Sequence, residues 1–259
     1  MVQRFDGLAE RYHRYRPGYP TAAVAAIAAV CREVEAEAPL LLDVGAGTGI
    51  GTRALAEALG PGWRLVGIEP SDDMRRTAVA QSAASKNISF QSGAAEALPF
   101  DDNSVGAMLV AQALHWFDRP VFYKQAGRLL VSGGGLFVLF NDRDPQARLF
   151  QDFEALMERE VAGYSRDYRQ FDYAGELGGL SWCVGVESHE FRWNWRLPLS
   201  GFSGLMLSRS MAKPWIEAAG EAVVGRELEA FAAAFADGDQ IELPYITRLV
   251  MARKRRRES

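Results

Sequence analysis

The feature that most constrains this chain is a glycine-rich loop between an apolar run and a helical pattern. The apolar run covers residues 40–44 and contains one acid, Asp43. Glycine then occupies every second position, at Gly45, Gly47 and Gly49. A strand that leads into a loop with few side chains brings backbone amides close to a ligand at the start of the next helix. The pattern therefore predicts a ligand site at the carboxyl edge of a parallel sheet.

A second run that ends in an acid indicates the kind of ligand. Residues 65–68 are apolar apart from Gly67, and Glu69 follows them twenty positions after Gly49. An acid at this place can accept hydrogen bonds from ribose hydroxyls, which predicts a cofactor that contains adenosine. The loop reads Gly-x-Gly-x-Gly, whereas a nicotinamide or flavin fingerprint reads Gly-x-Gly-x-x-Gly and a P-loop needs Gly-Lys-Ser/Thr. A dinucleotide site and a glycine turn without a ligand remain as alternatives.

Composition excludes several classes of protein. The chain has 259 residues, 48% of them hydrophobic, and a net charge of -4, so we expect a globular protein without an electrostatic surface for nucleic acid. Arg253 to Arg257 form a basic run, which is usually a solvated tail. Cys31 and Cys183 are the only cysteines, the N-terminus lacks an apolar signal region, and no run of 18 apolar residues occurs. We therefore expect a cytoplasmic protein that is not bound to a membrane.

Strand and helix patterns alternate over the first 140 residues, which predicts an α/β fold with a doubly wound, mostly parallel, seven-stranded sheet. The expected strands cover 40–44, 64–69, 88–91, 105–111, 136–140, 189–195 and 242–250. The expected helices cover 20–37, 50–59, a segment that begins with Ser71 as its N-cap, and 120–131, and the glycines at 133–135 predict a turn.

The pattern changes after Asn141, where aromatic residues become frequent and the periodicity is irregular. We interpret residues 141–186 as a helical cap inserted over the carboxyl edge of the sheet. The full division is an N-terminal lid segment at 1–19, a cofactor-binding core at 20–140, the cap, a C-terminal part of the core at 187–252, and a basic tail at 253–259.

Several motifs together resemble a known enzyme family. The Asp-x-Gly-x-Gly-x-Gly motif at 43–49 resembles the first motif of class I S-adenosylmethionine (SAM)-dependent methyltransferases. Ala95-Glu96-Ala97-Leu98-Pro99-Phe100 and Ala111-Gln112-Ala113-Leu114-His115-Trp116-Phe117-Asp118 resemble segments after strands three and four of the ubiquinone-biosynthesis and trans-aconitate type. Arg16-Pro17-Gly18-Tyr19-Pro20 resembles the N-terminal Arg-Pro-x-Tyr-Pro motif of the trans-aconitate-like subgroup, and 208–210 and 243–247 are similar to its C-terminal half.

The resemblance implies a Rossmann-like fold, SAM as cofactor and S-adenosylhomocysteine as product. It also implies transfer of a methyl group to a small molecule, with no metal and with a monomer or homodimer as the assembly. The implied cofactor-binding residues are Asp43, Gly45, Gly47, Gly49, Glu69, Pro70, Met74, Ala94, Ala95, Glu96 and Gln112. The implied substrate-binding residues are Arg16, Tyr19, His115 and Trp116, and His115 is also the implied catalytic residue.

The roles of these residues leave alternatives open. His115 is either a general base or a structural histidine that holds its loop. Arg16 is expected to meet the cofactor carboxylate or an anionic substrate, unless it lies on a solvated helix face, and Arg209 and Lys213 are further cations for an anionic acceptor. Trp116 either walls the pocket or packs in the sheet edge. The favoured reaction is O-methylation of a small acceptor such as a carboxylate. C- or N-methylation and a non-catalytic SAM-binding protein are the alternatives.

Overall fold

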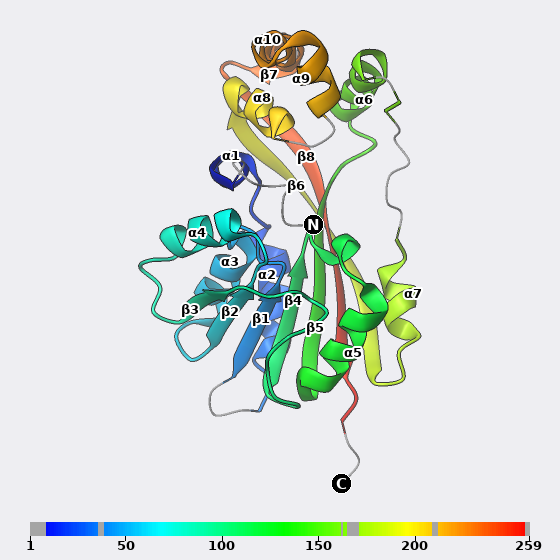
Figure 1. Ribbon diagram of the computed structural model, residues 1–259. Coiled ribbons are helices and arrows are strands. Elements are labelled where there is room, and N and C mark those ends of the chain that lie inside the picture. The colour runs from blue at the N-terminus through cyan, green and yellow to red at the C-terminus, as the bar shows by residue number, and fades with distance from the viewer. Residues whose placement is uncertain (1–8, 36–38, 162, 165–170, 209–211, 257–259) are drawn as a thin grey trace.

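A mostly parallel sheet forms the centre of the protein, whose computed structural model describes residues 9–35, 39–161, 163–164, 171–208 and 212–256 (Figure 1). In these residues the strands are β1 (Leu40–Val44), β2 (Arg64–Ile68), β3 (Ile88–Gln91), β4 (Val105–Ala111), β5 (Leu130–Arg143), β6 (Cys183–Pro198), β7 (Ala236–Asp237) and β8 (Gln240–Lys254). The strand order is β3-β2-β1-β4-β5-β8-β6, and the two-residue β7 pairs with β8. The predicted doubly wound, mostly parallel sheet is confirmed, and β7 adds an eighth strand to the seven that were expected.

The direction of the chain across the sheet creates a crevice. β1, β2, β3, β4 and β5 are parallel to one another, whereas β8 runs antiparallel to both β5 and β6. From β1 the chain moves outward to β2 and β3, and then returns to the other side of β1 to form β4 and β5. The strand order therefore reverses between β1 and β4. Ligands of open α/β sheets bind at such a switch point, beyond the carboxyl ends of the strands.

Side chains along each central strand point alternately to the two faces of the sheet. Both faces therefore carry apolar side chains, and helices cover both of them. In the described residues they are α1 (Ala9–Tyr15), α2 (Thr21–Cys31), α3 (Ile50–Leu59), α4 (Asp72–Gln81), α5 (Arg119–Leu129), α6 (Arg148–Glu160), α7 (Tyr173–Gly178), α8 (Leu199–Leu207), α9 (Lys213–Ala219) and α10 (Glu221–Ala233), with a 3-10 turn at Leu114–Trp116. Leu41 of β1 packs with α2 and α3 on one face. Leu42 packs with α5 and α7 on the other.

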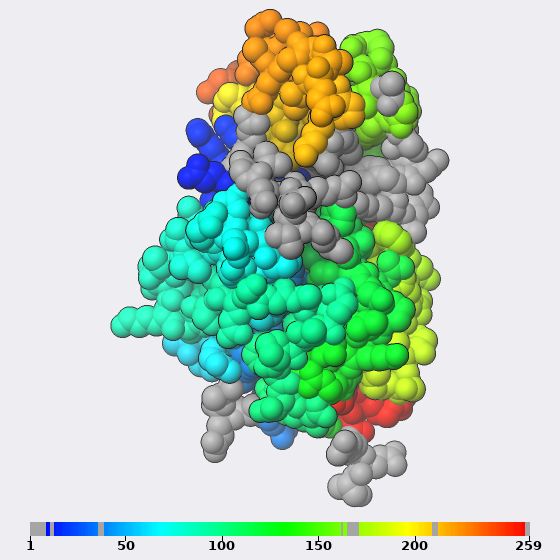
Figure 2. All heavy atoms as spheres, in the orientation of Figure 1, coloured from blue at the N-terminus to red at the C-terminus, as the bar shows by residue number. Residues whose placement is uncertain are grey.

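A third hydrophobic cluster forms a helical layer beyond the carboxyl ends of β1 and β4. Phe153 of α6, Phe202 of α8, Trp215 of α9 and Leu228 of α10 are buried together in it. The long strands β6 and β8 reach up into this layer, where Tyr245 of β8 joins the cluster (Figure 1). Figure 2 shows the orange, yellow and light-green atoms of these helices above the cyan and green atoms of the sheet region.

Helix α1 lies at the junction of the sheet region and the helical layer and contacts both α4 and α8. It appears in dark blue in Figures 1 and 2. The ring of Tyr15 covers Gly204 so closely that a Cβ there would lie 2.6 Å from the ring. Ala9 is also buried. Residues 9–15 are therefore packed against the rest of the chain at the level of the sheet's carboxyl edge.

Two local predictions are wrong. The helix expected over 20–37 ends at Cys31, after which residues 32 and 33 form a turn. The turn expected at 133–135 is part of β5, which begins at Leu130. A shift in register between Val105 and Ala107 of β4 accommodates the glycines as a bulge, with Gly133 at a φ of 78°.

The expected N-cap at Ser71 is confirmed, because its side chain accepts a hydrogen bond from the Met74 amide. The division into five segments stays a prediction.

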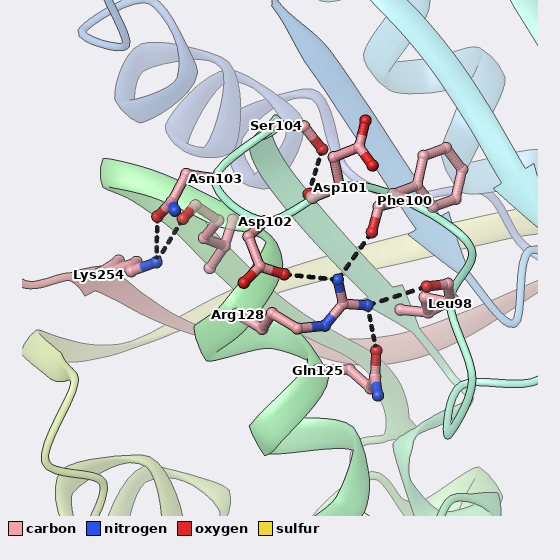
Figure 3. A network of polar contacts seen from close by, with 10 residues as sticks. Leu98, Phe100, Asp101, Asp102, Asn103, Ser104, Gln125, Arg128 and Lys254 are labelled. Atoms are coloured by element: carbon pink, nitrogen blue, oxygen red, sulfur yellow. Dashed lines mark hydrogen bonds and ion pairs between the residues drawn. The ribbon is translucent and has the colours of Figure 1, made fainter.

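One arginine holds the loop between β3 and β4 against α5 (Figure 3). The Arg128 guanidinium donates hydrogen bonds to the carbonyls of Leu98 and Phe100 at 3.0 and 2.8 Å, and to Asp102 at 2.8 Å. Lys254 of β8 donates to the Asn103 side chain at 2.8 Å from the other side of the loop. The loop that resembles the family motif after strand three is therefore fixed by side chains from two separate elements.

Candidate functional site

The glycine loop after β1 is a tight turn that only glycine fits. Gly45, Gly47 and Gly49 have φ angles of 73°, 56° and 77°, in the left-handed region that other residues rarely adopt. A Cβ on Gly45 would lie 2.6 Å from the Cβ of Ala113, so the space on that side is filled. A Cβ on Gly47 would meet nothing within 4 Å, so the loop is open there. The turn leads directly into the N-terminus of α3.

Glu69 lies beside this loop and is tied to it. Its Oε2 accepts a hydrogen bond from the Gly47 amide, and its Oε1 accepts one from the Ser71 amide, both at 2.9 Å. Burial raises the pKa of the carboxyl, and the two amides partly oppose that rise. Each carboxylate oxygen has capacity for a second hydrogen bond, so Glu69 can accept bonds from a ligand while it holds the loop.

Asp43 is completely buried at the end of β1. Its Oδ2 accepts a hydrogen bond from the Thr52 hydroxyl at 2.6 Å. Its Oδ1 has no hydrogen-bond partner among the described residues. Burial raises the pKa of this carboxyl to about 7. Because an unpaired charge is costly in such a place, Asp43 is suited to meet a cation that arrives with a ligand.

A pocket opens at the switch point between β1 and β4. It combines the glycine loop with the end of β4, the N-terminal segment, and the β5 and β8 strands. The described residues that line it are Arg16, Pro17, Tyr19, Gly45, Ala46, Gly47, Thr48, Ile50, Gly51, Ala111, Gln112, Asn141 and Tyr245. Five residues that the sequence predicts for cofactor or substrate binding are thus brought together, namely Arg16, Tyr19, Gly45, Gly47 and Gln112.

Gln112 and Asn141 fix the wall of the pocket opposite the glycine loop. Gln112 follows β4 in a left-handed conformation with a φ of 59°, which is uncommon for a residue with a side chain. Its side-chain amide donates to the Asn141 carbonyl at 3.2 Å. The Asn141 side chain donates to the Gly18 carbonyl at 2.8 Å and accepts from the Thr247 hydroxyl at 2.6 Å. Asn141 therefore connects the N-terminal segment to both β5 and β8.

Buried polar atoms without a partner gather at this pocket. The hydroxyl oxygens of Thr48 and Tyr245 are buried and have no hydrogen-bond partner in the described part of the chain. Thr48 and Tyr245 both line the pocket. Folded proteins pair nearly all buried polar groups, so such a group needs a specific explanation. A ligand that supplies the missing partners is one such explanation.

The remaining predicted residues lie outside the lining of this pocket. Asp43, Gly49, Glu69, Met74 and Ala95 are buried, whereas Pro70 and Ala94 are exposed. Glu96 accepts a hydrogen bond from the Asp118 amide at 2.8 Å, at the start of α5. Their cofactor-binding roles stay predictions.

His115 and Trp116 lie in the 3-10 turn after β4, also outside the pocket lining. Both are half-buried, and their ring centroids are 4.7 Å apart. The His115 ring also lies 6.2 Å from the ring of Phe140. Lys213 is exposed at the start of α9, and Arg209 lies outside the described residues. The roles predicted for these four residues in catalysis or substrate binding remain predictions.

Asn141, Thr48 and Tyr245 are pocket residues to which the sequence patterns assign no role. Tyr245 is part of a motif that resembles the family's C-terminal half, but its place at the pocket depends on β8 pairing antiparallel with β5. That pairing brings Tyr245 opposite Arg143, at the carboxyl end of β5. The spacing of residues within one segment of the sequence does not predict how two distant strands pair.

Two further features are absent from the described ranges, namely a cluster of metal-ligating side chains and a membrane-spanning helix. No group of three or more metal-ligating side chains is gathered in one place. No helix has the length and apolar character needed to cross a bilayer.

Comparison with known proteins identifies the family. The model of a methyltransferase domain matches residues 42–138, which include the last three residues of β1, the glycine loop and most of β5. An uncharacterised methyltransferase from Mycobacterium tuberculosis is 30% identical over 254 residues, which cover 97% of this chain and 96% of the relative. The chain belongs to the methyltransferase family. A demethylmenaquinone methyltransferase from Staphylococcus aureus is 34% identical to it over 116 residues, or 44% of this chain and 48% of that protein.

Solved structures of other methyltransferases share the fold. A protein from Anaeromyxobacter dehalogenans assigned as a type II methyltransferase has a TM-score of 0.67 at 21% identity, over 93% of this chain and 98% of that one. Phosphoethanolamine N-methyltransferase 2 from Haemonchus contortus, solved with SAM, has a TM-score of 0.55 at 16% identity, over 97% of this chain and 57% of that one. At these identities the likeness concerns the Rossmann-like methyltransferase fold alone.

Proposed function

We propose that this methyltransferase uses SAM to methylate a small molecule in the pocket at the switch point of its sheet. The observation that carries the proposal is the convergence of the open glycine loop, the tethered Glu69 and the buried Asp43 at the carboxyl ends of β1 and β2. These are the groups that an adenosine-containing sulfonium ligand needs: open backbone, a carboxylate for a ribose, and a carboxyl for an ammonium group.

The cofactor is proposed to bind along the edge of the sheet. Its ribose hydroxyls contact Glu69, and its methionine end lies against Gly45 and Gly47, with the ammonium group oriented by Asp43 directly or through water. Pro70, Met74, Ala94, Ala95 and Glu96 belong to the proposed adenosine side, and Gln112 to the methionine side. When bound, SAM supplies the activated methyl group. The protein has to orient it and exclude water, so much of the rate comes from positioning.

The acceptor is proposed to enter between the N-terminal segment and the helical layer, close to Arg16 and Tyr19. Both residues line the pocket, and Asn141 ties their segment to the sheet. O-methylation of a small carboxylate is the favoured reaction, because Arg16 can pair with an anionic group and an ionised carboxylate needs no general base at neutral pH. The resemblance to the trans-aconitate-like subgroup supports the same choice.

Two other functions remain as candidates. The phosphoethanolamine enzyme with the same fold is an N-methyltransferase, which keeps N-methylation as a second candidate together with C-methylation. A protein that binds SAM without transferring the methyl group is the third. The proposed setting is the cytoplasm, with a monomer or homodimer as the assembly and neither nucleic acid nor membrane as a partner.

Transfer of a radioactive methyl group from SAM to a panel of small carboxylic acids, phenols and amines tests the proposal. We expect carboxylic acids to take the label, and S-adenosylhomocysteine to form in equal amount. Label on amines or carbon acids alone would contradict O-methylation and leave the methyltransferase activity standing. Binding of SAM without transfer to any compound in the panel or in a cell extract would favour the non-catalytic candidate.

A further inference from the structure

Tyr245 holds an unusual position for a buried tyrosine. Its side chain is almost completely buried, and its ring is packed among Phe150 and Trp193, with centroids at 6.0 and 5.8 Å. Its hydroxyl group nevertheless has no hydrogen-bond partner among the residues that the structure describes. Burying a hydroxyl without a partner destabilises the folded protein, so phenylalanine would suit this position better if packing alone decided it.

The nearest polar side chain on the same face of β8, that of Thr247, has hydrogen-bond partners. Thr247 lies two residues further along β8, on the same face of the strand. Its hydroxyl accepts a hydrogen bond from the Trp193 indole at 2.8 Å and donates one to Asn141 at 2.6 Å. The missing partner of Tyr245 is therefore a specific feature of this one group, at a point where the residue borders the pocket.

The location of Tyr245 separates it from the cofactor groups. The glycine loop follows β1, and Tyr245 lies on β8, three strands away in the order β1-β4-β5-β8. Neighbouring strands are spaced by about 4.8 Å, so the two ends of the pocket are about 14 Å apart. That span accommodates the methionine end of a cofactor and a small acceptor in line with it. Tyr245 belongs to the acceptor end.

The charges at the pocket favour one class of acceptor. Of the described lining residues, Arg16 is the one cation, and none is an aspartate, a glutamate or a histidine. A phenol or an ammonium group would need a base to remove its proton before it could attack the methyl group. A carboxylate is already ionised at neutral pH, and its charge is complementary to Arg16.

We infer that the Tyr245 hydroxyl donates a hydrogen bond to a carboxylate acceptor, which is a role that rests on the proposed function. The hydrogen bond goes to the carboxylate oxygen that does not attack. The other oxygen forms the new bond to the methyl carbon, and the bond between that carbon and the cofactor sulfur breaks with its electron pair left on sulfur. The products are a methyl ester and S-adenosylhomocysteine, and no proton is transferred.

The variant Tyr245→Phe tests this role, with Tyr123→Phe as a matched control. Tyr123 is a buried tyrosine on α5 whose hydroxyl donates to Glu176 at 2.7 Å, away from the pocket. The assay supplies labelled SAM and the anionic small-molecule fraction of a bacterial extract. Label in methyl esters is recognised because mild base releases it as volatile methanol.

We expect the wild-type protein to produce base-labile label, and Tyr245→Phe to lower the rate at limiting acceptor at least tenfold. The same variant should bind SAM within twofold of the wild type and unfold at the same or a higher urea concentration. Tyr123→Phe should lose stability and keep its transfer rate. Base-stable label would overturn the carboxylate class, and an unchanged rate or a loss of stability in Tyr245→Phe would overturn its role. If the anionic fraction takes no label while the unfractionated extract does, the role of Tyr245 fails and the methyltransferase function stands; if neither takes label, both fail.

Discussion

At the scale of single residues, the most informative group is the Asp43 carboxyl. Burial raises its pKa to about 7, from an ordinary value near 4. The folded protein without ligand therefore binds more protons than the unfolded chain between these two values. Its unfolding free energy should fall, relative to an Asp43→Asn variant, as the pH rises from about 4 to about 7. Urea denaturation of both proteins across this range measures the difference.

The raised pKa of the Asp43 carboxyl also predicts how the affinity for the cofactor depends on pH. If the ammonium group of SAM lies beside Asp43, binding favours the ionised carboxylate, and the affinity should rise by up to about tenfold per pH unit below pH 7. Calorimetry in buffers of different ionisation enthalpy should detect release of a proton near pH 6. Asp43→Asn removes the titrating group and should flatten the profile. A profile that is equally steep in the variant would show that another group is responsible.

Residue patterns in the sequence identify the proposed cofactor loop better than the proposed acceptor end of the pocket. Gly45, Gly47 and Glu69 are recognisable because local geometry dictates them: a left-handed turn and an acid at the end of the next strand. Tyr245 and Asn141 have no such local signature. They reach the pocket only through the pairing of β5 with β8, two strands separated in sequence by almost a hundred residues.

At the scale of elements, the loop between β3 and β4 depends on Arg128. Replacing it with methionine keeps most of the apolar stem and removes the donors to the carbonyls of Leu98 and Phe100. We expect a loss of about 1–3 kcal/mol in the free energy of unfolding, because hydrogen-bond partners at the loop are left unpaired. Arg148, which is mostly exposed and pairs with Asp152, is the matched control. Its replacement by methionine should change the free energy by less than about 0.5 kcal/mol.

The N-terminal segment is the second element with a distinct prediction. Deleting residues 1–19 removes Arg16 and Tyr19 from the pocket and Tyr15 from its contact with Gly204. The buried strands β1 and β4 are untouched, so we expect turnover to be lost while a cooperative unfolding transition remains. Arg16→Met is a milder second variant that leaves α1 in place and should also lower turnover. Normal methylation by the truncated protein would contradict a lid role for this segment.

Element boundaries show where local patterns are insufficient. The strands at 40–44, 88–91 and 105–111 are predicted with their observed bounds, because they are short apolar runs between clear turn signals. The glycines at 133–135 look like a turn, yet β5 runs through them because pairing with β4 on one side and β8 on the other compensates for their low strand propensity. Tertiary context, which the sequence pattern does not contain, decides such cases.

At the scale of the whole molecule, three hydrophobic clusters hold the helices and strands together. Two of them cover the faces of the sheet and hold β1 and β4, where the strand order reverses. The third binds α6, α8, α9 and α10 into the helical layer around Tyr245. The pocket borders both the sheet and this layer, and Arg16, Pro17 and Tyr19 line one side of it. In the proposed function, the sheet region holds the cofactor and the layer helps to select the acceptor.

The central claim is that the pocket binds SAM through the glycine loop and Glu69, and calorimetric titration tests it most directly. We predict that S-adenosylhomocysteine and SAM each bind the wild-type protein with one site per chain, and that NADH does not bind. Glu69→Ala should weaken both interactions by about 1–3 kcal/mol, the scale of losing hydrogen bonds to a charged group. Binding of NADH in place of the two adenosyl ligands, or an affinity for them that Glu69→Ala leaves unchanged, would contradict the account.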